Sequence, residues 1–226
     1  MPYFDYMEVL YSKVGEIILS PKKYNIYTKD PEFLELLANV KYIQLDDEFN
    51  LPLDFLPYGV ISISTGAKFN QPLNNLPPTV KIIKISCNLS PWYDWMCEFN
   101  QELDGLHYGL EELTLINANN GNYHKPLDNL PPTLKTLKIL NSLFSEIVDG
   151  DSHVDINMLP DSLVSLTLSY VNLYCNVNRL PEHIKSITIK PGYVDSALRE
   201  KWLAHGYDMI KKVSNTQLVY LSITRT

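Results

Sequence analysis

Short apolar-polar-apolar alternations recur along the chain, and another aliphatic residue precedes each one by three positions. The pattern reads Leu-x-x-Leu-x-Ile. Five copies are complete: Val80/Ile83/Ile85, Leu110/Leu113/Leu115, Leu134/Leu137/Ile139, Leu163/Leu166/Leu168 and Ile184/Ile187/Ile189. A period of two gives a strand one buried face, and Val and Ile favour strand. The chain therefore predicts a series of short, half-buried strands.

Two further copies lack part of the repeat unit. The copy at Val40, Ile43 and Leu45 has the three aliphatic positions but no preceding Leu-Pro step. The copy after Pro57 is expected to be two residues short, with only Ile61-x-Ile63 remaining.

The segments between the strands are marked by proline and asparagine. Leu-Pro steps occur ahead of most copies: Leu56-Pro57, Leu76-Pro77, Leu130-Pro131, Leu159-Pro160 and Leu180-Pro181, with a degenerate Leu106-His107. Proline excludes a central strand or a helix interior, so a turn-rich return path is expected. Phe-Asn pairs stand upstream: Phe49-Asn50, Phe69-Asn70 and Phe99-Asn100, followed by the degenerate Tyr123-His124. Asparagine can bond backbone groups that the turns leave unpaired.

One such strand cannot bury its face alone, so the copies are expected to stack into a parallel sheet over a continuous leucine ladder. The alternation also predicts which strand positions face outward. They are Tyr42 and Gln44, Ser62 and Ser64, Ile82 and Lys84, Glu112 and Thr114, Thr136 and Lys138, Ser165 and Thr167, Ser186 and Thr188. This face is mostly small and hydroxylic, which is typical of a binding sheet.

Taken together, the units follow FNxPLxxLPxxLxxLxI over about 22 residues and resemble FNIP repeats, a leucine-rich-repeat variant of social amoebae and amoeba-infecting giant viruses. The resemblance covers residues 40–190 in about six units. It implies an α/β-type leucine-rich-repeat-like solenoid, a mostly parallel β-sheet with little helix in the repeats. It also implies a non-enzymatic role in protein binding. Family members often carry an F-box near the N-terminus, but the first 40 residues show no convincing F-box pattern.

The two ends are expected to be caps of short helix and strand segments. Residues 1–39 hold a strand candidate at 16–19 and a helix candidate at 31–38. Residues 191–226 hold a helix candidate at 194–205 and strand candidates at 207–213 and 217–224. Capping protects the exposed ends of a repeat array.

Two insertions interrupt the repeat on the same rim. The segment 87–98 contains Trp92, Tyr93, Trp95 and Met96. Exposed aromatic side chains dominate interface energetics, so this loop is a candidate partner-binding site. Alternatively, these rings fold down and cover the adjacent core.

The second insertion holds Glu146, Asp149, Asp151 and Asp155. Their spacing matches no EF-hand, so a solvated acidic loop is expected.

Composition and charge narrow the function. The chain has 226 residues, a net charge of −7 and three cysteines. Its acidity disfavours nucleic acid and membrane surfaces as partners. The odd cysteine count disfavours a disulfide framework, although Cys87 and Cys97 could pair. The sequence shows no signal peptide and no apolar run long enough to span a membrane, so an intracellular, cytoplasmic protein is expected, in the host cytoplasm if it is viral.

Catalytic chemistry has no support in the sequence. The nucleotide-binding, zinc-protease, redox and hydrolase motifs are all missing. We therefore expect no enzyme activity, no catalytic or metal-binding residues and no cofactor. His107 and His124 stand where sister repeats have proline and asparagine, and are interpreted as drift.

The leading hypothesis is a protein-interaction scaffold with an unknown partner, monomeric or weakly dimeric. Candidate partner-binding residues outside the aromatic loop are Tyr42, Lys84 and Lys138 on the outward face. The alternative is a carbohydrate or small-ligand binding module that uses the aromatic loop 87–98 as a stacking platform.

Overall fold

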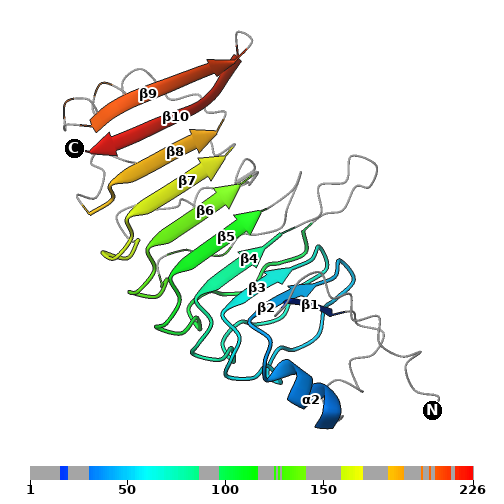
Figure 1. Cartoon of the computed structure of the whole chain (residues 1–226). Coiled ribbons are helices and arrows are strands. Elements are labelled where there is room, and N and C mark those ends of the chain that lie inside the picture. The colour runs from blue at the N-terminus through cyan, green and yellow to red at the C-terminus, as the bar shows by residue number, and fades with distance from the viewer. Residues whose placement is uncertain are drawn as a thin grey trace.

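The computed structural model describes residues 16–19, 31–86, 97–116, 125, 127, 129–140, 159–169, 183–190, 200, 204, 207–214 and 217–225. These residues form one ten-stranded sheet in the order β1-β2-β3-β4-β5-β6-β7-β8-β10-β9. Figure 1 shows the strands stacked as a ladder, with the connecting turns running beside it. The predicted parallel solenoid with little helix in its repeats is therefore confirmed.

The repeat strands lie where the alternation placed them. Their bounds are β2 Tyr42–Leu45, β3 Ser62–Thr65, β4 Ile82–Ile85, β5 Glu112–Ile116, β6 Thr136–Leu140, β7 Ser165–Ser169 and β8 Ser186–Lys190. Each pairs in parallel with the next, so that equivalent residues of successive repeats face one another. We call each strand, with the turns that lead into it, a coil.

The core is a ladder of equivalent aliphatic residues inside the solenoid. The first inward position of the strands is buried throughout the described coils: Ile17, Ile43, Ile63, Ile83, Leu113, Leu137 and Leu166. The described Leu-Pro leucines and the Phe-Asn phenylalanines are buried beside this ladder, and the rings of Phe69 and Phe99 stack with centroids 6.3 Å apart. Apolar burial is thus continuous from coil to coil, as a solenoid requires.

In the coils of β3 and β4, which the structure describes throughout, successive turns rather than a helix form the return path. Between β2 and β3 the N–H groups of Phe49, Leu56 and Val60 donate to carbonyl groups three residues earlier, at 3.2, 3.2 and 3.4 Å. The Leu-Pro step lies in these turns, where proline's missing N–H costs no sheet bond.

The repeated asparagine links neighbouring coils, as its polar chemistry predicted. Asn50 Oδ1 accepts the Asn70 N–H at 2.9 Å and Gln71 Nε2 at 3.0 Å. Asn70 Oδ1 repeats the bond with the Asn100 N–H at 2.9 Å. The asparagine therefore satisfies a turn donor in the next coil.

The expectation of a shortened copy after Pro57 is wrong. Ile63, rather than Ile61, pairs with Ile43 and Ile83, and Val60 is fully buried at the position of Val80. The coil has its full length, but Thr65 stands where the pattern requires an apolar residue. A polar side chain at that position concealed the repeat.

The ends also join the sheet. At the N-terminal end, β1 (Glu16–Leu19) pairs in parallel with β2, and helix α2 (Pro31–Leu37) precedes β2. At the C-terminal end, β10 (Gln217–Arg225) runs antiparallel to β8 and to the edge strand β9 (Tyr207–Ser214). All four elements agree with the sequence prediction to within a residue. In the 194–205 segment, Glu200 and Ala204 are helical.

Candidate protein-binding face

The outward face of the sheet carries the polar strand positions that the alternation predicted. Tyr42 is 49% exposed, and the other positions on this face are exposed or half-buried except Thr114. Thr114 is only 6% exposed because it lies in register between Lys84 and Lys138 on the neighbouring strands. The two lysines therefore flank a short threonine along one row of the face.

The two lysines on this row have different electrostatic settings. Lys138 Nζ lies 2.6 Å from Glu112 Oε1, on the strand beside it, so its charge is compensated. Lys84 is exposed and forms no ion pair within the described part of the chain. It is the cation of this row that remains open to a ligand carboxylate.

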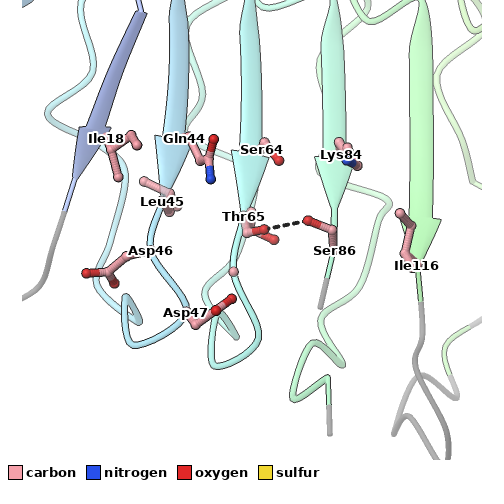
Figure 2. Close-up of a pocket in the computed structure, with 11 residues that line it drawn as sticks. Ile18, Gln44, Leu45, Asp46, Asp47, Ser64, Thr65, Lys84, Ser86 and Ile116 are labelled. Atoms are coloured by element: carbon pink, nitrogen blue, oxygen red, sulfur yellow. Dashed lines mark hydrogen bonds between the residues drawn. The ribbon is translucent and has the colours of Figure 1, made fainter. Parts of the chain in front are cut away.

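A pocket of about 440 Å³ opens at the carboxyl ends of β1 to β5. Figure 2 shows Gln44, Ser64 and Lys84 side by side on successive strands, with Asp46 and Asp47 beyond the end of β2. The lining is completed by backbone or side-chain atoms of Ile18, Leu45, Thr65, Gly66, Ser86 and Ile116. The pocket thus combines one ammonium, two carboxylates, an amide and several hydroxyl groups.

The two aspartates already bond to the backbone. Asp46 Oδ1 accepts the Glu48 N–H at 3.1 Å, and Asp47 Oδ1 accepts the Ala67 N–H at 3.3 Å. The first bond holds the turn after β2, and the second ties that turn to the next coil. Ser86 similarly donates its hydroxyl to the Thr65 carbonyl at 2.8 Å, as Figure 2 shows. The pocket wall is therefore held by inter-coil hydrogen bonds.

Gly66 allows the turns at this rim to approach closely. A Cβ atom at Gly66 would lie 2.2 Å from the carbonyl oxygen of Asp46, which is a backbone clash. Glycine is therefore needed for the coil of β4 to stack against the turn that carries the two aspartates.

A second electrostatic feature lies at the entry to the strands, outside the pocket. Glu111 Oε2 is 2.8 Å from Lys135 Nζ, and its Oε1 is 2.8 Å from Lys81 Nζ. The bonds to Lys135 and then Lys81 lower the pKa of Glu111 to about 2. Opposite charges thus alternate over three successive coils.

The same alternation occurs beside the phenylalanine ladder. Lys68 Nζ lies 2.6 Å from Glu48 Oε2. The bond to Glu48, assisted by the charge of Glu98, raises the pKa of Lys68. Neither charge row was predicted from the sequence, although equivalent positions in the aligned repeats carry these charges.

His107 has a structural role that its interpretation as drift overlooked. Its Nδ1 accepts the Gly109 N–H at 2.9 Å, which closes the turn where sister repeats use proline. Burial lowers the pKa of His107, partly offset by the Val80 carbonyl. The lowered pKa favours the neutral imidazole, whose Nδ1 can accept this bond.

Several sequence-based candidates lie outside the described residues: Trp92, Tyr93, Trp95, Met96, the acidic residues of 146–155, Cys87 and His124. Of the aromatic insertion, the structure describes Cys97, which is 3% exposed, and Glu98, whose N–H donates to the Ala67 carbonyl at 2.9 Å. The structure brings Lys84 into the pocket, and places Tyr42 and Lys138 on the same face outside its lining. A partner-binding role for these residues stays a prediction.

The described residues contain no group of three or more His, Cys, Asp or Glu side chains that could hold a metal ion. None of the helices they form has the length and apolarity needed to cross a membrane.

Comparison with known proteins identifies the repeat. The FNIP Repeat family matches residues 51–88, which include most of the coil of β3 and the whole coil of β4. Among solved structures, CroV588, described as a novel circular LRR protein, matches with a TM-score of 0.35 and 17% sequence identity. The match covers 78% of this chain and 29% of CroV588, so the chain spans less than a third of that protein's length. The curated proteins contain no match.

Proposed function

Since this chain carries FNIP repeats stacked in a parallel-sheet solenoid, we propose that it is a non-enzymatic scaffold that binds a protein partner on the outward face of its sheet. The supporting observation is the pocket of about 440 Å³ at the carboxyl ends of β1 to β5, with Lys84 in its lining. Repeat solenoids present extended surfaces of this kind to partners.

The row of Gln44, Ser64 and Lys84 on one side of the pocket suits a carboxylate-bearing side chain of the partner. Lys84 offers an ammonium group, while Gln44 and Ser64 on the preceding strands offer an amide and a hydroxyl. A charge-assisted bond to an ammonium is stronger than a neutral one, and hydroxyl and amide groups satisfy the remaining lone pairs. We expect the partner to insert an aspartate or glutamate here.

Tyr42 supplies the apolar part of the proposed interface. It lies two residues before Gln44 on β2, on the same face, and is 49% exposed. Tyrosine buries a large ring at low entropic cost and keeps a hydroxyl for hydrogen bonding, which is why it is common at interface hot spots.

The lining favours recognition over acid–base chemistry. Asp46 and Asp47 each commit an oxygen to a backbone N–H, and these bonds hold the turns. These carboxylates hold the wall of the pocket in place, and Lys84 is the charged group that we expect to bind the partner's carboxylate.

The proposal is tested by affinity capture from an amoebal lysate with four immobilised chains: wild type, Lys84→Glu, Lys41→Glu and Tyr42→Ala. Lys41 is exposed and lies just before β2, outside the pocket lining. Lys41→Glu therefore changes the net charge of the chain as much as Lys84→Glu does, but leaves the pocket intact. We expect a protein that wild type and Lys41→Glu retain and Lys84→Glu loses, and Tyr42→Ala to weaken its retention. Equal retention by Lys84→Glu, or the absence of any protein held specifically by the wild type, would refute the proposal. Circular dichroism confirms that each variant is folded.

A further inference from the structure

The turns that lead into β3 and β5 expose two tyrosines at equivalent positions. Tyr58 is 78% exposed and Tyr108 is 75% exposed. Each follows the Leu-Pro or Leu-His step of its coil and precedes a glycine, Gly59 or Gly109. Rings this exposed gain little from burial, so they contribute little to the fold.

The coils of β4 and β6 place an exposed proline at the same position. Pro78 lies between the two tyrosines in coil order, and Pro132 follows Tyr108. These positions therefore read Tyr58, Pro78, Tyr108, Pro132, with tyrosine and proline alternating from one coil to the next. We call these four residues the Tyr-Pro stripe.

Backbone bonds fix the spacing of the stripe. Neighbouring coils are hydrogen-bonded through the residue three positions after each stripe residue. The Lys81 N–H donates to the Ile61 carbonyl at 2.8 Å, and the Glu111 N–H donates to the Lys81 carbonyl at 2.8 Å. Strands bonded in this way lie about 4.8 Å apart. Tyr58 and Tyr108 are two coils apart, so their backbones are separated by about 10 Å along the solenoid axis.

Close contact between the turns supports this spacing at the stripe itself. A Cβ atom at Gly109 would lie 2.6 Å from the Pro78 carbonyl oxygen, and a Cβ atom at Gly59 would lie 3.0 Å from the Ala38 carbonyl oxygen. The glycine after each tyrosine therefore lets its turn stack tightly on the preceding coil. This contact keeps the spacing between successive stripe residues close to the spacing between the strands.

A spacing of about 10 Å matches the repeat of a polyproline II helix, which has three residues per turn and rises about 9.3 Å in that turn. We propose that the Tyr-Pro stripe binds a proline-rich peptide in the polyproline II conformation, lying along the solenoid axis. One prolyl ring per turn packs on each tyrosine ring. The tyrosine hydroxyls donate to peptide carbonyls, which this helix leaves without internal bonds.

Charge at the end of the stripe adds a preference for a basic flank. In the coil of β7 the equivalent position is Asp161, whose side chain is fully exposed, 3.7 Å from His183 Nδ1. A peptide that runs past Pro132 reaches this carboxylate. A lysine or arginine beyond the prolines would pair with it, at an exposed site where the gain is modest.

This inference concerns a surface other than the sheet face and does not rest on the proposed scaffold function. It is tested by fluorescence anisotropy with a fluorescein-labelled peptide of nine prolines that carries two lysines at each end. A Gly-Ser peptide with the same lysines controls for charge, because it does not adopt a stable polyproline II helix. Wild-type chain is expected to bind the proline peptide and not the Gly-Ser peptide.

Five variants separate the stripe from the rest of the surface. Tyr58→Ala and Tyr108→Ala are each expected to weaken binding about fivefold to tenfold, and the double variant to remove measurable binding, as truncation of an aromatic anchor does. Tyr42→Ala, on the sheet face, and Lys84→Glu, in the pocket, should leave the dissociation constant unchanged.

Three results would overturn the inference. They are the absence of proline-peptide binding at millimolar wild-type chain, equal binding of the Gly-Ser peptide, and wild-type affinity in the Tyr58→Ala/Tyr108→Ala double variant. None of them affects capture of a protein through Lys84, so failure here and failure of the scaffold function are distinguishable.

Discussion

Replacing Thr65 by valine is expected to stabilise the protein. Thr65 is 2% exposed, and its Oγ1 has no hydrogen-bond partner among the described residues. The equivalent inward positions of the neighbouring strands hold Leu45 and Ile85. Valine has nearly the shape of threonine, so Thr65→Val replaces a buried, unbonded hydroxyl with a methyl group at an apolar position.

The magnitude follows from the cost of the unbonded hydroxyl. Burying a polar group without a partner costs about 1–3 kcal/mol, and the methyl group adds favourable apolar burial of under about 1 kcal/mol. We expect the free energy of unfolding to rise by about 1–2 kcal/mol, allowing for some relaxation of the coil. With an m-value of about 3 kcal/mol/M in urea, the unfolding midpoint rises by about 0.3–0.7 M.

The assay is equilibrium urea unfolding followed by circular dichroism, with Thr133→Val as the matched control. Thr133 Oγ1 donates to the Leu110 carbonyl at 2.8 Å, so the same substitution there removes a made bond and should lower the midpoint. The two variants must therefore shift the midpoint in opposite directions. An unchanged or lower midpoint in Thr65→Val would mean that the hydroxyl finds a partner in solution, and the reasoning would be wrong.

Two further substitutions test the contacts between coils. Asn70→Ala removes the acceptor of the Asn100 N–H and is expected to destabilise the chain by about 1–3 kcal/mol. The control Asn75→Ala, at an exposed asparagine, should cost under about 0.5 kcal/mol. Similar losses at both sites would contradict a stabilising role for the asparagine bonds between coils. Glu111 has its pKa lowered from 4.5 to about 2, so its stabilising effect is complete above pH 4.5 and is lost as the pH falls toward 2. Glu111→Gln should therefore flatten the decline of the urea midpoint over that interval, and a wild-type decline in this variant would show that its ion pairs are not made in solution.

The strands could be predicted from sequence because their burial follows a local rule. The Leu-x-x-Leu-x-Ile pattern reports an inward face through a period of two, and this places the repeat strands correctly. The prediction failed at Thr65, because a single polar residue at a buried position removes the signal while the sheet on both sides still imposes the strand. Tertiary context there outweighs the residue's own preference.

The contacts that shape the candidate site were less visible, because they join residues far apart in the chain. Lys138 pairs with Glu112, and Asp47 bonds to the N–H of Ala67. Neither bond follows from a local pattern, since each depends on the parallel register of adjacent coils. The pocket also depends on Gly66, whose missing side chain matters only once the turn of Asp46 is stacked against it.

The residues that follow the Tyr-Pro stripe give a separate reason to assign it a role in recognition. After the prolines the chain has Thr79 and Thr133, whose hydroxyls donate to carbonyls of the preceding coil at 2.9 and 2.8 Å. After the tyrosines it has glycine, which has no hydroxyl to donate, so both tyrosine coils forgo a bond worth about 1 kcal/mol. The tyrosine rings are too exposed to recover that energy by burial. Tight stacking of the turns accounts for the two glycines, but not for an exposed tyrosine before each of them, so the tyrosines are better explained by binding than by folding.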